Sequence, residues 1–408
     1  MISKRLVLAA FVSLGWVSAG ATASLAQDRT AKIGVLSDQS GPYQDSTGLG
    51  SVAAAELAVE DSGLRARGWK IDVLSADHQN KADIGANIAR KWIDTQDVDV
   101  IADGNASSVA LAVTQLTRDK NRVFINSGAA TSELTNEQCT PNTIHWAYDT
   151  YMVGSGTGSA ITKAGGDSWF FLTADNAFGT ALERETSAAA KANGGSVLGS
   201  VRHPFNSSDF SSYLLQAQAS KAKVIGLSNA GSDPINAIKQ AAEFGIIDGG
   251  QKLAGLLLFI SDIHSLGLKS AQGIVLTESF YWDMNDGTRA FARRFQQKMK
   301  NKQMPTMVQA GVYSGVLHYL RALEALGGNP RDGAAVVAKM KDMPTNDPLF
   351  GKGLIQPNGR KIHPAYLFEV KKPSESKEAW DYYKHVATIP AEQAFTPLDK
   401  SSCPLLKK

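Results

Sequence analysis

Cysteine is almost absent from this sequence, with two residues, Cys139 and Cys403, among 408. So few cysteines exclude a disulfide-rich scaffold, and the lack of a Cys-x-x-Cys motif argues against a thiol redox or zinc-ribbon site. An excess of one charge is also lacking, since 42 basic residues face 39 acidic ones. A net charge of +3 gives no reason to expect nucleic acid as a partner. After residue 26, no apolar run approaches the roughly 20 residues that a membrane-spanning helix needs.

The patterns that mark common enzyme classes are missing too. The seven histidines are scattered without His-Glu-x-x-His spacing, so we expect no metal site, and we expect no cofactor. Neither the dinucleotide motif Gly-x-Gly-x-x-Gly nor a Walker-type phosphate loop follows a strand. The nearest approach to the Gly-x-Ser-x-Gly of serine hydrolases centres on Ser228 but ends in Ala230. A secreted hydrolase using Ser228 is therefore an alternative that needs a histidine and an acid at the same loop.

The first 26 residues have the pattern of a secretory signal peptide. Lys4 and Arg5 precede an apolar run over residues 6–17, and small residues follow. Cleavage fits after Ala23 or Ala26, and we favour Ala26. Export to the periplasm, an oxidising compartment, would allow a disulfide. The one pairing possible within the chain, Cys139 with Cys403, would tie the C-terminal tail to a loop near the middle of the chain.

Apolar strands and amphipathic helices alternate through the mature chain, which predicts an α/β fold with two doubly wound parallel-sheet lobes. We expect lobe 1 to comprise residues 27–147 plus 278–352, and lobe 2 to comprise 148–277 plus 353–408. The expected strands are 31–36, 71–74, 98–102, 123–125, 169–172, 196–201, 224–227, 253–260, 273–277 and 366–370. Three helical patterns follow residue 277.

Ligands of open parallel sheets bind beyond the carboxyl ends of the strands, so we expect the solute in the cleft between the lobes. After one predicted strand, Asn105-Ala-Ser107-Ser108 opens a helix, where free N–H groups favour a carboxylate. After the next strand, the small residues Gly128, Ala129 and Ala130, with Thr131, let the backbone approach a ligand. The other candidates in the cleft loops are Tyr43, Tyr148, Tyr151, Phe178, Asn229 and Phe259.

Five segments in order carry a family resemblance: KIGVLSDQSGPYQDSTGLG, DGNASSVALAV, INSGAATSELT, TADNAFGTAL and MPTMVQAGVYSGVLHYLRAL. Together they resemble the type I periplasmic solute-binding proteins of the leucine/isoleucine/valine-binding family, which serve ABC transporters. The resemblance implies two lobes joined by a multi-strand hinge that close over a small solute. It also implies delivery to an ABC permease in the inner membrane, without catalysis, and we expect a monomer. The same fold serves in receptors, so a sensory role is a further alternative.

The resemblance also suggests roles for single residues. It places the carboxylate-binding serine at Ser107, the backbone site at Gly128 and Ala129, and the hydroxyl position of amino-acid binders at Ala130, with Thr131 next. It places the aromatic residue of the second lobe at Phe178. The acid that usually receives the ligand's ammonium should lie in residues 256–259, which are Leu-Leu-Leu-Phe; Asp262 follows.

The missing acid bears on the solute, because an ammonium group without a carboxylate partner is costly to bury. We therefore favour a small carboxylate-bearing solute, an apolar or aromatic organic acid, over a branched-chain amino acid. Arg202 and His203 are alternative partners for the carboxylate.

Overall fold

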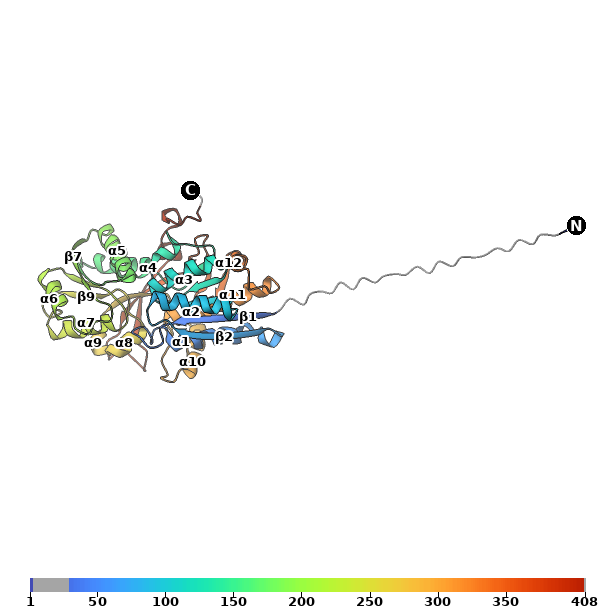
Figure 1. Ribbon diagram of the computed structural model, residues 1–408. Helices are drawn as coiled ribbons and strands as arrows, with labels where there is room; N and C mark the ends of the chain where they lie inside the picture. The colour runs from blue at the N-terminus through green and yellow to red at the C-terminus, as the bar shows by residue number, and fades with distance from the viewer. Residues whose placement is uncertain (3–28, 407–408) are drawn as a thin grey trace.

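The apolar runs of the N-terminal part form a parallel sheet of five strands in the order β2-β1-β3-β4-β5 (Figure 1). The structure, a computed structural model, describes residues 1–2 and 29–406. The predicted signal peptide therefore lies almost entirely outside the described residues. The strands of this sheet are β1 (Thr30–Ser37), β2 (Lys70–Asp77), β3 (Val100–Asp103), β4 (Val123–Asn126) and β5 (Thr143–His145).

Both faces of this sheet are covered, so the inner strands β3 and β4 are short, mostly apolar runs that are buried along their whole length. Successive residues of β3 point to opposite faces, so Val100 and Ala102 belong to one apolar cluster and Ile101 to another. Helices α2 (Ala82–Thr95) and α3 (Ser107–Asp119) share the cluster of Ile101. Helices α1 (Gly48–Ser62) and α11 (Met307–Ala325) share the cluster of Val100.

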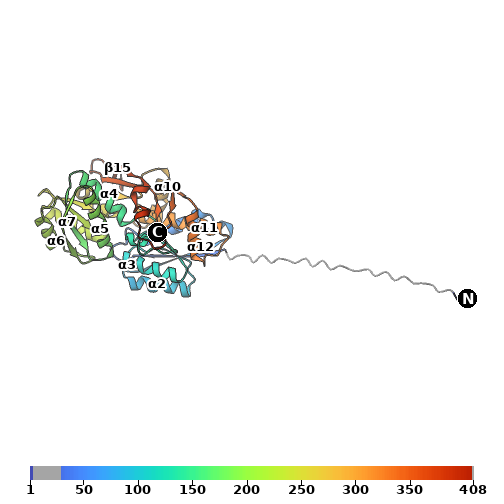
Figure 2. The ribbon, with the colours of Figure 1, turned by 90° about the horizontal axis from the view of Figure 1, so that it is seen from above.

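A second parallel sheet has four strands in the order β7-β6-β8-β9. In Figures 1 and 2 its helices α5, α6 and α7 gather at one end of the molecule, and α2, α3, α11 and α12 (Gly333–Asp342) gather at the other. The elements of this part are α4 (Thr150–Lys163), β6 (Ser168–Ala174), α5 (Ala177–Ala192), β7 (Ser196–His203), α6 (Ser211–Ala219), β8 (Val224–Ser228), α7 (Ser232–Glu243), β9 (Lys252–Gly255), α8 (Ile260–Leu266) and α9 (Leu268–Ala271). The two sheets confirm the predicted fold of two doubly wound lobes.

The chain then returns to the first sheet, as its helical pattern predicts. Helix α11 packs against α1, and Gln309 Nε2 donates to the carbonyl oxygen of Thr47. The elements of this part are β10 (Val275–Glu278), α10 (Asp286–Lys298), α11, α12 (Gly333–Asp342), β11 (Thr345–Asp347), β12 (Gly351–Ile355), β13 (Lys361–Ile362), β14 (Ala365–Val370), β15 (Tyr383–Ile389) and α13 (Ala391–Ala394), with short 3-10 turns at Arg65–Arg67, Ser132–Thr135 and Leu398–Lys400. Strands β10, β14 and β15 form an antiparallel sheet.

Two contacts fasten distant segments together. The buried guanidinium of Arg360 donates to the carbonyl oxygens of Trp146 and Tyr148, which lie between β5 and α4. A disulfide joins Cys139 and Cys403, whose Cα atoms are 5.6 Å apart. These contacts hold the segment before β14 and the C-terminal tail against the chain that leaves the first sheet.

The structure differs from the predicted strands in two ways. The apolar run over residues 253–260 is a strand only to Gly255, and Ile260 begins α8. Residues 256–259 are buried in a loop, so their apolar character reflects burial and not strand pairing. Strand β15 is absent from the predicted strands because its residues are mostly exposed and lack an apolar pattern. The short strands β5, β11, β12 and β13 are absent from the prediction too. Among the described residues, no helix combines the length and apolar character that crossing a membrane requires.

Candidate functional site

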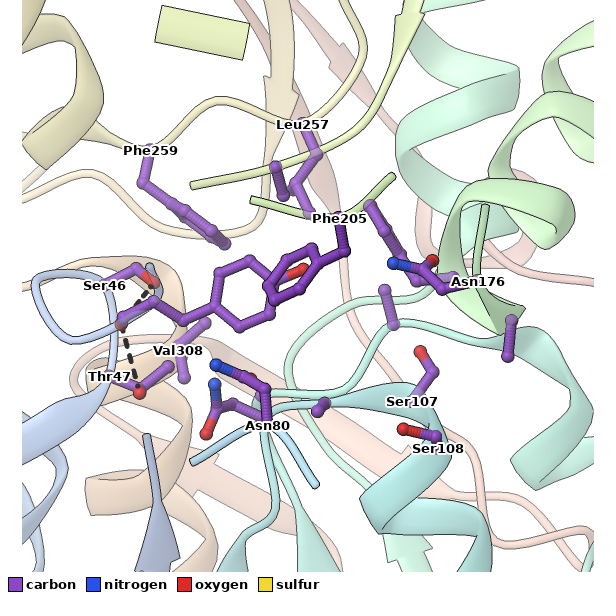
Figure 3. Close-up of a pocket in the computed structure, with 18 of the residues that line it drawn as sticks. Ser46, Thr47, Asn80, Ser107, Ser108, Asn176, Phe205, Leu257, Phe259 and Val308 are labelled. Atoms are coloured by element: carbon purple, nitrogen blue, oxygen red, sulfur yellow. Dashed lines mark hydrogen bonds between the residues drawn. The ribbon is translucent and has the colours of Figure 1, made fainter. Parts of the chain in front are cut away.

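A cavity of about 230 Å³ lies where the carboxyl ends of the two parallel sheets face each other (Figure 3). Loops after all nine parallel strands contribute to its lining, as the topology of open sheets dictates. From the first sheet come Tyr43, Ser46 and Thr47 after β1, Asn80 after β2, Asn105 to Ser108 after β3, Gly128 and Ala130 after β4, and Tyr148 after β5. From the second sheet come Asn176, Ala177 and Phe178 after β6, Phe205 after β7, Ala230 after β8, and Leu257 and Phe259 after β9, while Val308 comes from α11.

The amino terminus of α3 meets this cavity through Ser107 and Ser108. The first N–H groups of a helix have no partner inside the helix and carry a partial positive charge. Ser107 Oγ accepts a hydrogen bond from the backbone N–H of Thr131, 3.3 Å away, which leaves its own proton free to donate. This end of the cavity is suited to an anionic oxygen of a ligand.

Contacts with neighbouring side chains fix the position of the loop after β4. A Cβ at Gly128 would overlap Asp103 and Asn105, so glycine is required there. The carbonyl oxygen of Gly128 accepts from the hydroxyl of Tyr148 at 2.6 Å. The loop therefore brings its backbone to the cavity in a fixed position.

Aromatic side chains from the loops of the two parallel sheets meet across the cavity. The rings of Tyr43 and Phe205 lie 5.4 Å apart, and those of Tyr148 and Phe259 lie 6.1 Å apart edge to face. Burial raises the pKa of both Tyr43 and Tyr148, so their hydroxyl groups stay neutral. Because tyrosines of one sheet contact phenylalanines of the other, the structure describes the lobes in contact around the cavity.

Among the described residues, no Asp, Glu, Lys, Arg or His lines this cavity. Asp262 turns away and accepts from the backbone N–H of Phe259 at 2.8 Å, and burial raises its pKa to about 7. Arg202 is exposed and donates to Thr180 Oγ1 at 2.7 Å. His203 is buried beside Asn229. The suggested alternatives Asp262, Arg202 and His203 are thus not positioned to contact a ligand here.

Nine of the thirteen candidate ligand residues line the cavity, and four do not: Ala129, Thr131, Tyr151 and Asn229. Both backbone groups of Ala129 bond the side chain of Asn126. The hydroxyl of Thr131 accepts from the N–H of Glu133 and caps a 3-10 turn. Asn229 bonds His203, and Tyr151 is half-buried on α4. Ala129 and Thr131 thus use polar groups within their own loop, and Asn229 Nδ2 is used by His203.

Ten further lining residues are not among the thirteen candidates, namely Ser46, Thr47, Asn80, Ala106, Asn176, Ala177, Phe205, Ala230, Leu257 and Val308. Two of these, Asn80 and Phe205, follow β2 and β7, strands whose loops we did not consider. The rule that ligands bind at strand carboxyl ends, applied to every strand, would have found both.

The hydrolase alternative has no support in the geometry. The Ser228 hydroxyl is buried without a hydrogen-bond partner and is not among the lining residues. The nitrogen atoms of His203 lie against the Pro204 carbonyl oxygen and Asn229 Nδ2. In the part of the chain that the structure describes, no group of three or more His, Cys, Asp or Glu residues is arranged to hold a metal.

A family model described as periplasmic binding protein matches residues 30–377. A curated relative, Leu/Ile/Val-binding protein homolog 6 of Brucella melitensis, is 25% identical over 384 residues, covering 90% of this chain and 93% of the relative. A periplasmic binding protein from Burkholderia mallei is 52% identical, with a TM-score of 0.89 over 93% of this chain and 100% of the other.

Two further solved structures carry more informative descriptions. A branched-chain amino acid ABC transporter periplasmic ligand-binding protein from Burkholderia xenovorans is 41% identical, with a TM-score of 0.82 over 92% of this chain and 99% of the other. A solute-binding protein of an ABC transporter from Rhodopseudomonas palustris, in complex with 4-hydroxybenzoate, is 23% identical and shares the fold, with a TM-score of 0.82 over 91% and 100% of the two chains.

Proposed function

Because the chain belongs to the periplasmic binding protein family, as a solute-binding protein of the ABC-transporter type and not an enzyme, we propose that it carries a small apolar or aromatic carboxylic acid that lacks an amine. The proposed site is formed by the lining residues of the cavity, with the carboxylate at the amino terminus of α3.

The absence of charged side chains from the described lining carries this proposal. An α-amino acid brings an ammonium and a carboxylate, and both lose their water when the lobes close. The carboxylate has the partial positive charge of α3 and the hydroxyl of Ser107 as partners. An ammonium would have no carboxylate to pair with, and burying an unpaired charge is costly.

The rest of the lining favours an apolar body for the solute. Phe178, Phe205, Leu257, Phe259 and Val308 supply apolar surface, and a volume of about 230 Å³ restricts the solute to a small molecule. The complex of a protein of the same fold with 4-hydroxybenzoate is in keeping with this class of solute.

The mechanism in this proposal is binding followed by delivery to an inner-membrane ABC permease. The contact between Tyr43 and Phe205 joins the lobes over the cavity, so a bound solute stabilises the closed form. We further propose that the protein acts as a monomer, with the lobe boundaries predicted from its sequence.

Pairs of compounds that differ only in the α-amine test this function. Protein refolded to remove any bound solute would be titrated with leucine and 4-methylpentanoate, and with phenylalanine and 3-phenylpropanoate. We expect the acids to bind at least tenfold more tightly than their amino-acid counterparts and to raise the melting temperature. Tighter binding of leucine than of 4-methylpentanoate would show instead that the protein is a branched-chain amino-acid carrier.

A further inference from the structure

The polar groups of the cavity lie at two separate places. In the close-up view, Ser107, Ser108 and Asn176 lie toward one end, while Ser46, Thr47 and Asn80 lie toward the other (Figure 3). Phe205, Leu257 and Phe259 lie over the space between them. A carboxylate at α3 leaves the second polar end without an assigned partner.

Asn105, a lining residue, carries an unused hydrogen-bond donor. Its Oδ1 accepts from the backbone N–H of Asp38 at 2.8 Å and lies 2.7 Å from His78 Nε2. Because a backbone N–H can only donate, the oxygen of the amide must face Asp38, and Nδ2 faces the other way. The side chain is 7% exposed, and Nδ2 is buried without a hydrogen-bond partner.

Asn80 presents an unused acceptor beside it. Its Nδ2 donates to the carboxylate of Asp38, so its Oδ1 faces away, buried and without a partner. Its backbone N–H donates to His78 Nδ1 at 3.0 Å, which makes His78 Nε2 the donor to Asn105. Asp38 and His78 thus hold both amides in fixed and opposite orientations.

An unpaired donor and an unpaired acceptor together point to one kind of ligand group. Buried polar atoms without partners are costly, and a hydroxyl can accept from one amide while it donates to the other. No cation lines the cavity among the described residues, so a neutral hydroxyl fits better than an oxyanion.

We propose that Asn80 and Asn105 form a hydroxyl-binding subsite, and that the solute is a hydroxylated carboxylic acid with an apolar or aromatic body. This inference rests on the proposed function, since it takes the carboxylate to lie at α3. The subsite adds recognition of a second group that carries both a donor and an acceptor.

Calorimetric titration of the wild-type protein with benzoate, 3-hydroxybenzoate, 4-hydroxybenzoate and 4-methoxybenzoate tests the subsite. We expect one hydroxybenzoate to bind at least tenfold more tightly than benzoate. The methoxy compound keeps an acceptor but has no donor, so we expect it to lose this preference. Equal affinities for benzoate and both hydroxybenzoates would overturn the subsite and leave the proposed function intact.

Variants then locate the effect. In Asn80→Ala and in Asn105→Ala, we expect the ratio of the hydroxybenzoate and benzoate affinities to fall toward one. Asn176→Ala, at the other end of the cavity, should change both affinities together and keep the ratio. An unchanged ratio in both Asn80→Ala and Asn105→Ala would overturn the subsite. If no aromatic acid binds the wild-type protein but leucine does, the proposed function fails and the subsite fails with it.

Discussion

At the scale of single residues, Ser107 is the side chain on which binding of a carboxylate should depend most. Its hydroxyl already accepts from the N–H of Thr131, so its proton is available to the ligand. Replacing Ser107 by Ala should weaken binding of a carboxylate by about 1–3 kcal/mol, the worth of a hydrogen bond to a charged group. Calorimetry measures this, with the exposed Ser265→Ala on α8 as control. Unaltered affinity in Ser107→Ala would place the carboxylate elsewhere.

His78 should make stability depend on pH. Burial holds its pKa below the ordinary value of 6.5, so the folded state takes up this proton less readily than the unfolded state. The stability that depends on neutral His78 is complete above pH 6.5 and is lost as the pH falls below it, by up to about 1.4 kcal/mol per unit. Urea unfolding at pH 7.5 and 5.5 should show a larger loss for wild type than for His78→Gln. Equal losses would exclude His78 as the group responsible.

Local sequence chemistry was enough to find some lining residues but not others. Ser107 and Gly128 stood out because a helix start and a small-residue loop follow buried strands. Thr131 has the same local features, yet its hydroxyl caps a turn, which only the fold reveals. Asn80 and Asn105 share Asp38 as a partner, which depends on a sheet order that no local pattern contains.

At the scale of elements, Asn176 combines the cap of α5 with a place in the cavity lining. Its Oδ1 accepts from the N–H of Gly179 at 2.8 Å. Asn176→Asp should keep this cap, because an aspartate also accepts from the N–H groups of a helix start. It also adds a negative charge to an uncharged lining, so we expect at least tenfold weaker binding of benzoate with little change in melting temperature. Loss of benzoate binding together with a lower melting temperature would indicate damage to α5 instead.

A strand could be predicted from the sequence where the same residues are both buried and paired in a sheet. Strands β4 and β8 lie inside the two parallel sheets and are buried along their whole length, so they are short, mostly apolar runs between helices. Residues 256–259 are apolar because they enclose the cavity and the core. The apolar pattern therefore predicts a strand that extends beyond the end of β9. Strand β15 is exposed along most of its length, so pairing with β14 creates it without an apolar pattern.

At the scale of the whole molecule, the site is a product of topology. Nine parallel strands from two sheets end at one place, and no two neighbouring loops in sequence would form the cavity alone. Alternating strands and helices are sufficient to predict the two lobes and a cleft between them. How the lobes meet depends on contacts such as Tyr43 with Phe205, which join residues 162 positions apart and follow from no sequence period.

The disulfide should contribute to the stability of the whole fold but not to recognition. It joins residues 264 positions apart, and Ser401 Oγ adds a hydrogen bond to the carbonyl oxygen of Thr135. Closing so long a loop restricts the unfolded chain, so replacing both cysteines by serine should lower the free energy of unfolding by about 2–4 kcal/mol. Neither cysteine lines the cavity, and we expect the affinity for benzoate at 25 °C to match wild type. Chemical unfolding and calorimetry on the same samples separate the two effects. A folded double variant with weaker binding would mean that the C-terminal tail positions the loop after β4, which leads into the turn that the tail contacts.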